Sequence, residues 1–126
     1  MSISAPDDEV TNEGTRYLKT YHNLWQALNS ADGKLQVLGQ DAVNPADRAD
    51  ARAEDLKVKA MMGNMDEAYY AWLNDGAQVQ APTMAQYTRS IALAEELSHV
   101  NAQQTRARTI IALVGEALGI ANYLHT

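Results

Sequence analysis

The hydrophobic positions near the start of the chain recur at alternating spacings of four and three residues. This spacing places them on one face of an α-helix, as in a heptad repeat. The stripe predicts a helix from about residue 15, or somewhat earlier, to residue 40, and Gly33 falls off its apolar face. The stripe consists of Tyr17, Tyr21, Leu24, Leu28, Ala31, Leu35 and Leu38.

A second helix is predicted over residues 45–74. Asn44 is a good N-cap, Pro45 suits the first helical position, and Asp47 places a negative charge in the first turn. Gly76, which can adopt a positive φ, predicts the C-terminal end. The apolar stripe is clearest late in this helix, at Val58, Met62, Met65, Tyr69 and Trp72.

A third helix is predicted over residues 83–100, because Thr83 and Gln86 have the spacing of a capping box. The stretch from 98 to 108 is polar. Either the chain breaks there, with Asn101 and Gln104 capping a fourth helix over 102–124, or one long helix runs through it. The expected apolar face of the third helix is Tyr87, Ile91, Ala94 and Leu97.

The last segment is apolar along two stripes. Such a helix is either sandwiched at the centre of a bundle or shares one face with a partner. Gly115 and Gly119 form a G-x-x-x-G motif, which allows another backbone to approach closely, either within the chain or from a second copy. The stripes are Ile111, Val114, Leu118 and Ala121, and Ile110, Leu113, Ala117, Ile120 and Leu124.

These elements predict an all-α fold, a three- to four-helix antiparallel bundle that forms a single domain over residues 1–126. Residues 1–14 precede the first stripe and are expected to be disordered or to fray. No internal repeat or second domain is visible. The residues expected to be largely buried are Leu24, Leu28, Met62, Met65, Ile91, Leu97, Val114 and Leu118.

Composition narrows the class of function. The chain has 126 residues, and ten Lys and Arg against sixteen Asp and Glu give a net charge of −6. This charge disfavours nucleic acid or an anionic membrane as the main ligand. The absence of cysteine excludes thiolate metal sites and a cysteine nucleophile. With no signal-like start and no run of about 20 apolar residues, a cytoplasmic protein without membrane contact is expected.

The chain offers little catalytic chemistry. Glu96 and His99 have the E-x-x-H spacing of di-iron bundles, but such sites need that motif twice, and neither His22 nor His125 supplies it again. No phosphate-binding loop or nucleophile elbow is present. We therefore expect a protein that is not an enzyme and holds no cofactor or metal.

Charged residues of the second helix are predicted to face water. Asp47, Asp50 and Glu54 recur at helical spacing and indicate a solvated acidic face. Asp55 and Lys59 have the favourable i,i+4 spacing for an ion pair.

The aromatic residues are unusual, with six Tyr, two Trp and no Phe. Every aromatic side chain thus carries a polar group and suits a position that is partly buried and partly wet, as at protein interfaces. Together with the small residues of the last helix they define a candidate protein interface. It comprises Tyr17, Tyr21, Trp25, Tyr69, Tyr70, Trp72, Gly115, Gly119 and Tyr123.

The function predicted first is that of a small acidic, non-catalytic helical protein that binds another protein and modulates or inhibits it. An immunity protein, a phage-encoded inhibitor or an anti-activator acts in this way. The alternative is a self-assembling structural or secreted helical component, and the third hypothesis is a metal-binding helical bundle enzyme. A homodimer through the last helix is compatible with the first two.

Overall fold

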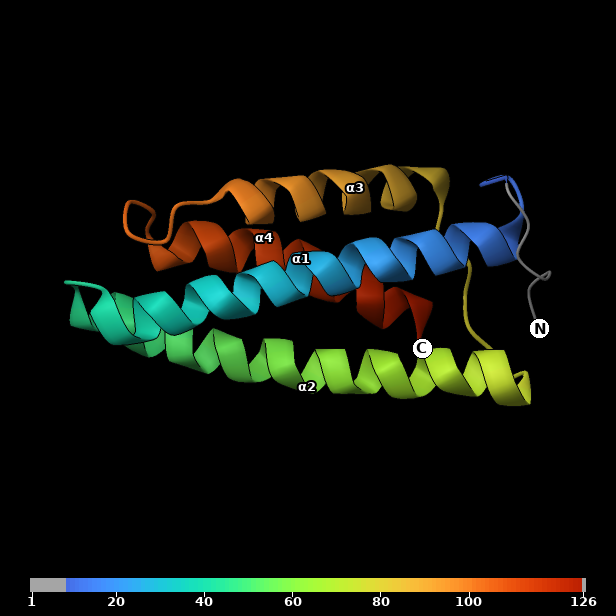
Figure 1. Cartoon of the computed structure of the whole chain (residues 1–126), viewed down its shortest axis with the longest axis horizontal. Coiled ribbons are helices and arrows are strands. Elements are labelled where there is room, and N and C mark those ends of the chain that lie inside the picture. The colour runs from blue at the N-terminus through green and yellow to red at the C-terminus, as the bar shows by residue number, and fades with distance from the viewer. Residues whose placement is uncertain (1–8, 126) are drawn as a thin grey trace.

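Four helices lie side by side in the computed structural model, which describes residues 9–125 (Figure 1). They are α1 (Glu13–Asp41), α2 (Pro45–Asp75), α3 (Met84–His99) and α4 (Ala107–Leu124). No strand occurs among the described residues. The predicted all-α class and antiparallel bundle are confirmed. The expectation that residues 1–14 are disordered or fray lies outside the described residues for 1–8, and it is wrong for Glu13 and Gly14, which belong to α1.

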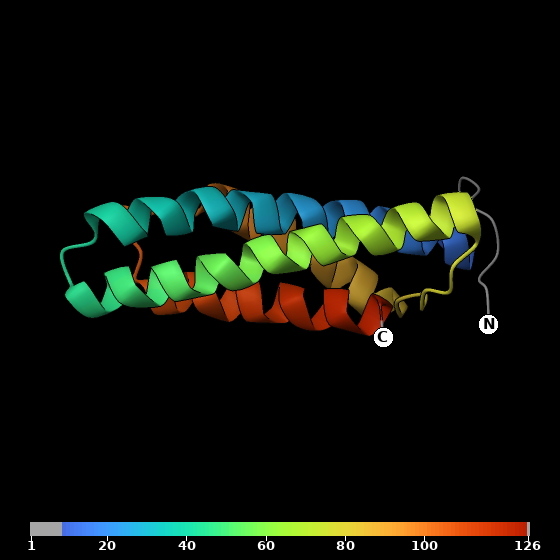
Figure 2. The ribbon, with the colours of Figure 1, turned by 90° about the horizontal axis from the view of Figure 1, so that it is seen from below.

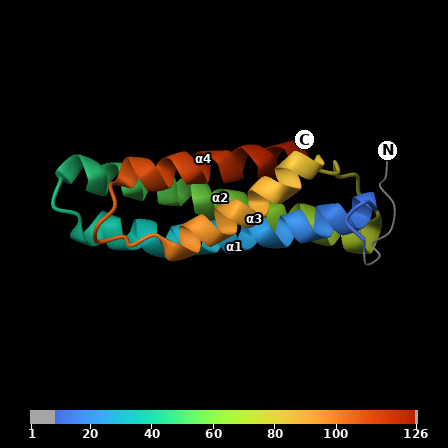
Figure 3. The same cartoon turned by 90° about the horizontal axis from the view of Figure 1, so that it is seen from above.

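The helices run alternately up and down the bundle. The α1–α2 turn and the α3–α4 loop lie at one end, and the α2–α3 connection lies at the other (Figures 1 and 2). α1 is in contact with all three other helices, with α2 and α3 on opposite sides of it. α3 crosses the bundle obliquely, from near the C-terminal end of α4 to the C-terminal half of α1 (Figure 3).

The first two helices begin and end through local capping. Asn12 accepts a hydrogen bond from the backbone N–H of Thr15 at 3.0 Å, so α1 begins at Glu13. Asn44 accepts from the N–H of Ala46 at 2.8 Å, as the predicted start of α2 requires. Gly76 has a φ of 66° and ends α2 in the left-handed conformation. The predicted limits of α2 are confirmed to within a residue.

The chain breaks between α3 and α4, so the alternative of one long helix is wrong. The predicted capping box is present, with reciprocal bonds of 3.0 and 2.9 Å between Thr83 and Gln86. α4 begins at Ala107 rather than at residue 102. The reason is that Asn101 accepts from the N–H of Gln103 at 3.0 Å and so stabilises a turn within the loop.

The core lies between α1 and the faces that the other helices turn toward it. Five of the residues expected in the core are fully buried, while Met62 and Leu118 are only half-buried. Those five are Leu24, Leu28, Met65, Leu97 and Val114.

The predicted face of α3 is wrong at Ile91, which is 38% exposed. α3 instead turns Ser90, Leu93 and Leu97 inward. Burial of the Ser90 hydroxyl is tolerated because it donates to the carbonyl of Tyr87 at 2.6 Å and accepts from the Asn23 amide at 3.2 Å.

The expectation of a solvated acidic face on α2 is wrong for two of its three residues. Asp50 is exposed, but Asp47 and Glu54 are buried. A basic residue accompanies each buried carboxylate. Asp47 is bound by Arg106, and Glu54 lies 3.5 Å from the ammonium group of Lys57.

α4 is in contact with all three other helices, as α1 is, and it nevertheless leaves one face open to solvent. Gly115 and Gly119 are exposed, and a Cβ added at either would meet no atom within 4 Å. The motif therefore mediates no close packing within the chain. Among the described residues α4 alone has the length and hydropathy to cross a membrane, and a third of it is buried in the bundle.

Candidate functional site

An aromatic stack joins α1 to α2. The rings of Tyr21 and Tyr69 lie nearly parallel, with centroids 4.1 Å apart and an interplanar angle of 11°. The Tyr21 hydroxyl donates a hydrogen bond to the carboxylate of Asp66, one turn before Tyr69 on α2. Burial, followed by the neighbouring Asp66, raises the pKa of Tyr21 well above its usual value. The hydroxyl thus stays protonated. Ring stacking on Tyr69 and the hydrogen bond to Asp66 together fix the position of Tyr21.

A second aromatic group lies deeper, where α1, α2 and α4 meet. Tyr17 is fully buried and packs edge-on against Trp72, with ring centroids 4.7 Å apart. Its hydroxyl lies 2.8 Å from Nε2 of His125. Burial lowers the pKa of His125 and raises that of Tyr17. The phenol and the neutral imidazole therefore share a hydrogen bond, and this contact ties the end of α4 to α1.

The outer side of the stack is open to solvent. We call His22, Tyr69, Tyr70 and Leu73 the aromatic surface. Tyr69 lies at its centre, with the rings of His22 and Tyr70 5.8 and 5.5 Å away. Leu73 lies one turn further along α2. Tyr70 is 58% exposed and Leu73 49%, which is high for side chains of this size.

The charges around the aromatic surface are mainly negative. Glu67 and Asp75 are exposed on the same part of α2 and form no ion pair within the described part of the chain. No Lys or Arg occurs in the sequence between Lys59 and Arg89. On α1, Lys19 lies one turn before His22 and is the nearest basic residue along that helix. The surface therefore combines exposed apolar rings with an acidic border.

The residues predicted as a protein interface do not form one surface. Tyr17 and Tyr21 belong to the interior, and Trp25 and Trp72 are half-buried against the core. Only Tyr69 and Tyr70 contribute to the aromatic surface. Gly115, Gly119 and Tyr123 are exposed on α4.

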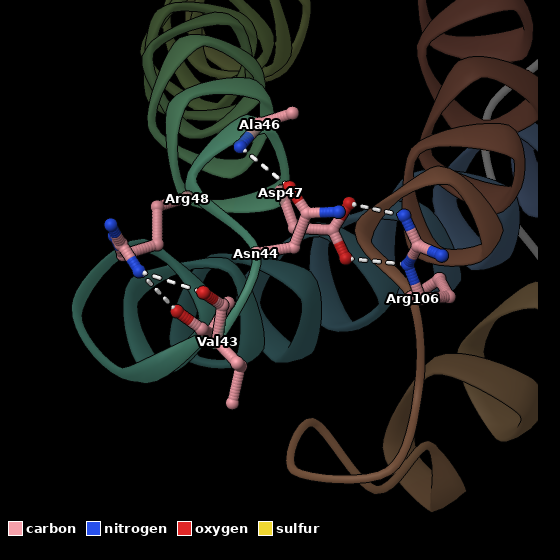
Figure 4. A network of polar contacts seen from close by, with 7 residues as sticks. Val43, Asn44, Ala46, Asp47, Arg48 and Arg106 are labelled. Atoms are coloured by element: carbon pink, nitrogen blue, oxygen red, sulfur yellow. Dashed lines mark hydrogen bonds and ion pairs between the residues drawn. The ribbon is translucent and has the colours of Figure 1, made fainter.

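The opposite end of the bundle carries a polar network (Figure 4). Asp47, in the first turn of α2, accepts two hydrogen bonds from the Arg106 guanidinium, at 2.7 and 3.1 Å. These bonds, and the backbone N–H of Ala107, hold the pKa of Asp47 below its usual range. Arg48 donates to the carbonyls of Ala42 and Val43, at 2.6 and 3.3 Å. The Asp47–Arg106 pair thus joins the starts of α2 and α4, and Arg48 stabilises the α1–α2 turn.

Two carboxyl groups, of Asp32 on α1 and Asp55 on α2, lie close together near the middle of these helices. Lys59 lies 3.3 Å from Asp55, which confirms the predicted ion pair, and 3.9 Å from Asp32 on α1. One buried oxygen of Asp55 has no hydrogen-bond partner within the described structure. Burial and the adjacent Asp32 carboxyl raise the pKa of Asp55 to about 6.

Glu96 and His99, the E-x-x-H residues of α3, contact different groups. Glu96 lies 3.3 Å from Arg89, which also binds Glu116 of α4 at 2.5 Å. Nδ1 of His99 lies 2.9 Å from the carbonyl of Glu95. Among residues 9–125 no three His, Asp or Glu side chains converge in a way that could hold a metal ion.

Sequence reasoning missed the Asp47–Arg106 pair. The two residues are 59 positions apart, and no spacing rule connects them. It also missed His22 and Leu73 as members of the aromatic surface, because their exposure depends on how α1 and α2 are rotated against each other.

Comparison with known proteins adds no relative. No protein-family model, no curated protein and no solved structure matches this chain.

Proposed function

We propose that this protein is a non-catalytic binding protein that holds another protein on its aromatic surface and thereby modulates or inhibits it. The observation that carries the proposal is the exposure of Tyr70 and Leu73 beside the fixed Tyr21–Tyr69 stack. Rings that are ordered before binding lose little conformational entropy on binding, and large rings make effective anchors.

The acidic border favours a basic partner. Glu67 and Asp75 leave negative charge unneutralised beside the rings, and the whole chain carries −6. Opposite charges steer association and fix orientation, and their effect weakens with salt. The expected partner thus offers an apolar or aromatic side chain flanked by Lys or Arg.

Site-specific photo-crosslinking in cells of the source organism tests this proposal. The photoreactive residue p-benzoylphenylalanine is placed at position 70 and, as a matched control, at position 56. Leu56 is an exposed residue of the same helix outside the aromatic surface. We expect one defined adduct with a basic protein from position 70, none from position 56, and loss of the adduct in Leu73→Asp.

The purified partner then allows a quantitative test. Tyr70→Ala is expected to weaken binding by on the order of 2 kcal/mol, as anchor residues do, and Leu56→Ala is expected to leave the affinity unchanged. Affinity should fall as salt rises. Equal adducts from both positions, or an adduct that survives Leu73→Asp, would contradict the proposal.

A second candidate function is self-assembly through α4. It is favoured by the open space over Gly115 and Gly119, which leaves room for the backbone of a facing helix. Light scattering over a range of concentrations is expected to reveal oligomers that Gly119→Leu separates into folded monomers. A parent protein that stays monomeric throughout rules this candidate out.

A further inference from the structure

The two connections at one end of the bundle border an open cavity of about 870 Å³. It lies between the α1–α2 turn and the α3–α4 loop, at the end of α2 away from the aromatic surface. Small-molecule sites usually measure about 300–1,000 Å³. The cavity therefore has the size of a ligand site and is separate from the proposed protein-binding surface.

Apolar side chains form part of the cavity. Leu38 is buried, and Ala42 and Ala102 are half-buried beside it. They come from α1 and from the α3–α4 loop, which places apolar surface on both sides. An aliphatic ligand body would lose contact with water there.

Two of the charged residues that line the cavity form an ion pair with each other. Asp47 and Arg106 both line it, and their two hydrogen bonds neutralise each other's charge. The nearby Arg48 does not line the cavity; its guanidinium is held on the carbonyls of the α1–α2 turn, pointing away from Arg106 (Figure 4).

Asp41 is the remaining charge in the lining. It is the last residue of α1, it is exposed, and it has no hydrogen bond or ion pair within the described structure. The C-terminal end of a helix carries partial negative charge, and at the end of α1 the guanidinium of Arg48 binds the carbonyls of Ala42 and Val43. Asp41 is therefore the one charged residue of the lining without a partner among residues 9–125, and it lies beside an apolar surface.

We infer that this cavity binds a primary alkylammonium group, with the cation against Asp41 and the alkyl chain against the apolar surface. Both a free alkylamine and the side chain of a lysine in another protein present this chemistry. An anion is disfavoured, because the carboxylate of Asp47 neutralises Arg106 and occupies two of its five N–H donors.

Backbone amide NMR titrations test the inference on the full chain. The probes are n-butylammonium and the blocked lysine N-acetyl-lysine methylamide, and the controls are n-butanol and butyrate. We expect saturable shifts at Ala42, Ala102 and Thr105, with a dissociation constant on the order of 1 mM for so small a probe. Butanol and butyrate should bind about ten-fold more weakly or not at all, since they lack the charge-assisted bond.

Two variants locate the cation. Asp41→Asn is expected to weaken n-butylammonium binding about ten-fold, the value of one charge-assisted contact. Asp50→Asn removes an exposed acid outside the cavity and should change nothing. Stronger binding of the blocked lysine than of n-butylammonium identifies a protein side chain as the source, and the reverse identifies a free amine. Equal binding of butanol, shifts spread over the surface, or no effect of Asp41→Asn overturns the inference.

Discussion

Asp47 and Arg106 bind each other through two parallel hydrogen bonds across the end of the bundle, and they join the first turn of α2 to the start of α4. Arg106 is the N-cap residue of α4, and its own side chain makes no capping bond. The Asp47 carboxylate, close to the N–H of Ala107, supplies negative charge at that N-terminus from another helix.

Replacing Asp47 with Asn is expected to destabilise the bundle at neutral pH. The pKa of Asp47 is lowered in the folded state, so its contribution is present above the unfolded pKa of about 3.9 and is lost as the pH falls through the lower folded value. Urea unfolding should show a lower midpoint for Asp47→Asn than for the control Asp50→Asn at pH 7. The difference should shrink in strong acid. Equal midpoints at pH 7 would mean that the pair contributes nothing.

The carboxyl pair of Asp32 and Asp55 should give the opposite pH dependence. The folded pKa of Asp55 is raised to about 6, whereas the unfolded value is about 3.9. Its stabilising, protonated form is therefore fully present below the unfolded pKa and is lost as the pH rises through 6. Asp55→Asn keeps a hydrogen-bond donor without the charge. We expect it to be more stable than the parent at pH 8, with a flatter pH profile between 5 and 8 in thermal melts.

The exposed glycines of α4 cost stability in the single chain. Ala has a higher helix propensity than Gly by about 1 kcal/mol, and its methyl group meets open space at both positions. Gly115→Ala and Gly119→Ala should each raise the free energy of unfolding by roughly 0.5–1 kcal/mol. Gly119→Leu should also remain folded. A loss of stability measured by chemical denaturation would contradict the exposed position of this face.

Truncations should distinguish the true core from the face expected for α3. Leu28 is fully buried, so Leu28→Ala is expected to cost about 2–5 kcal/mol. Leu118 is half-buried, so Leu118→Ala should cost less than Leu28→Ala. Ile91→Ala should stay within about 0.5 kcal/mol. A loss at Ile91 as large as at Leu28 would show that α3 is rotated away from the described packing.

The predictable part of this fold depends on short-range chemistry. The Thr83–Gln86 box and the left-handed Gly76 are set by neighbouring residues, so the limits of α2 and the start of α3 followed from the sequence. Ser90 illustrates the limit. Its buried hydroxyl is satisfied by hydrogen bonds with Tyr87 and Asn23. Assigning the buried face of α3 from residue polarity alone was therefore wrong.

The candidate site was predictable only in its residue types. An excess of Tyr and Trp indicated an interface, but the rotation of α1 against α2 determines which rings reach solvent. Tyr21 and Tyr69 come from different helices, and their stacking depends on the pairing of the two. For the same reason the burial of Asp47 depends on Arg106, whose position is set only when α4 docks.

The order of the helices along the chain has a consequence for biosynthesis. Of the four helices, α1 leaves the ribosome first, and it contacts all three that follow. Its apolar face stays uncovered until α2 follows, and the short α1–α2 turn allows these two helices to pair as a hairpin before α3 and α4 are made. Such sequence-local pairing gives a low contact order, for which folding within microseconds to milliseconds is typical. α3 and α4 therefore pack against a pair of helices that is already in place.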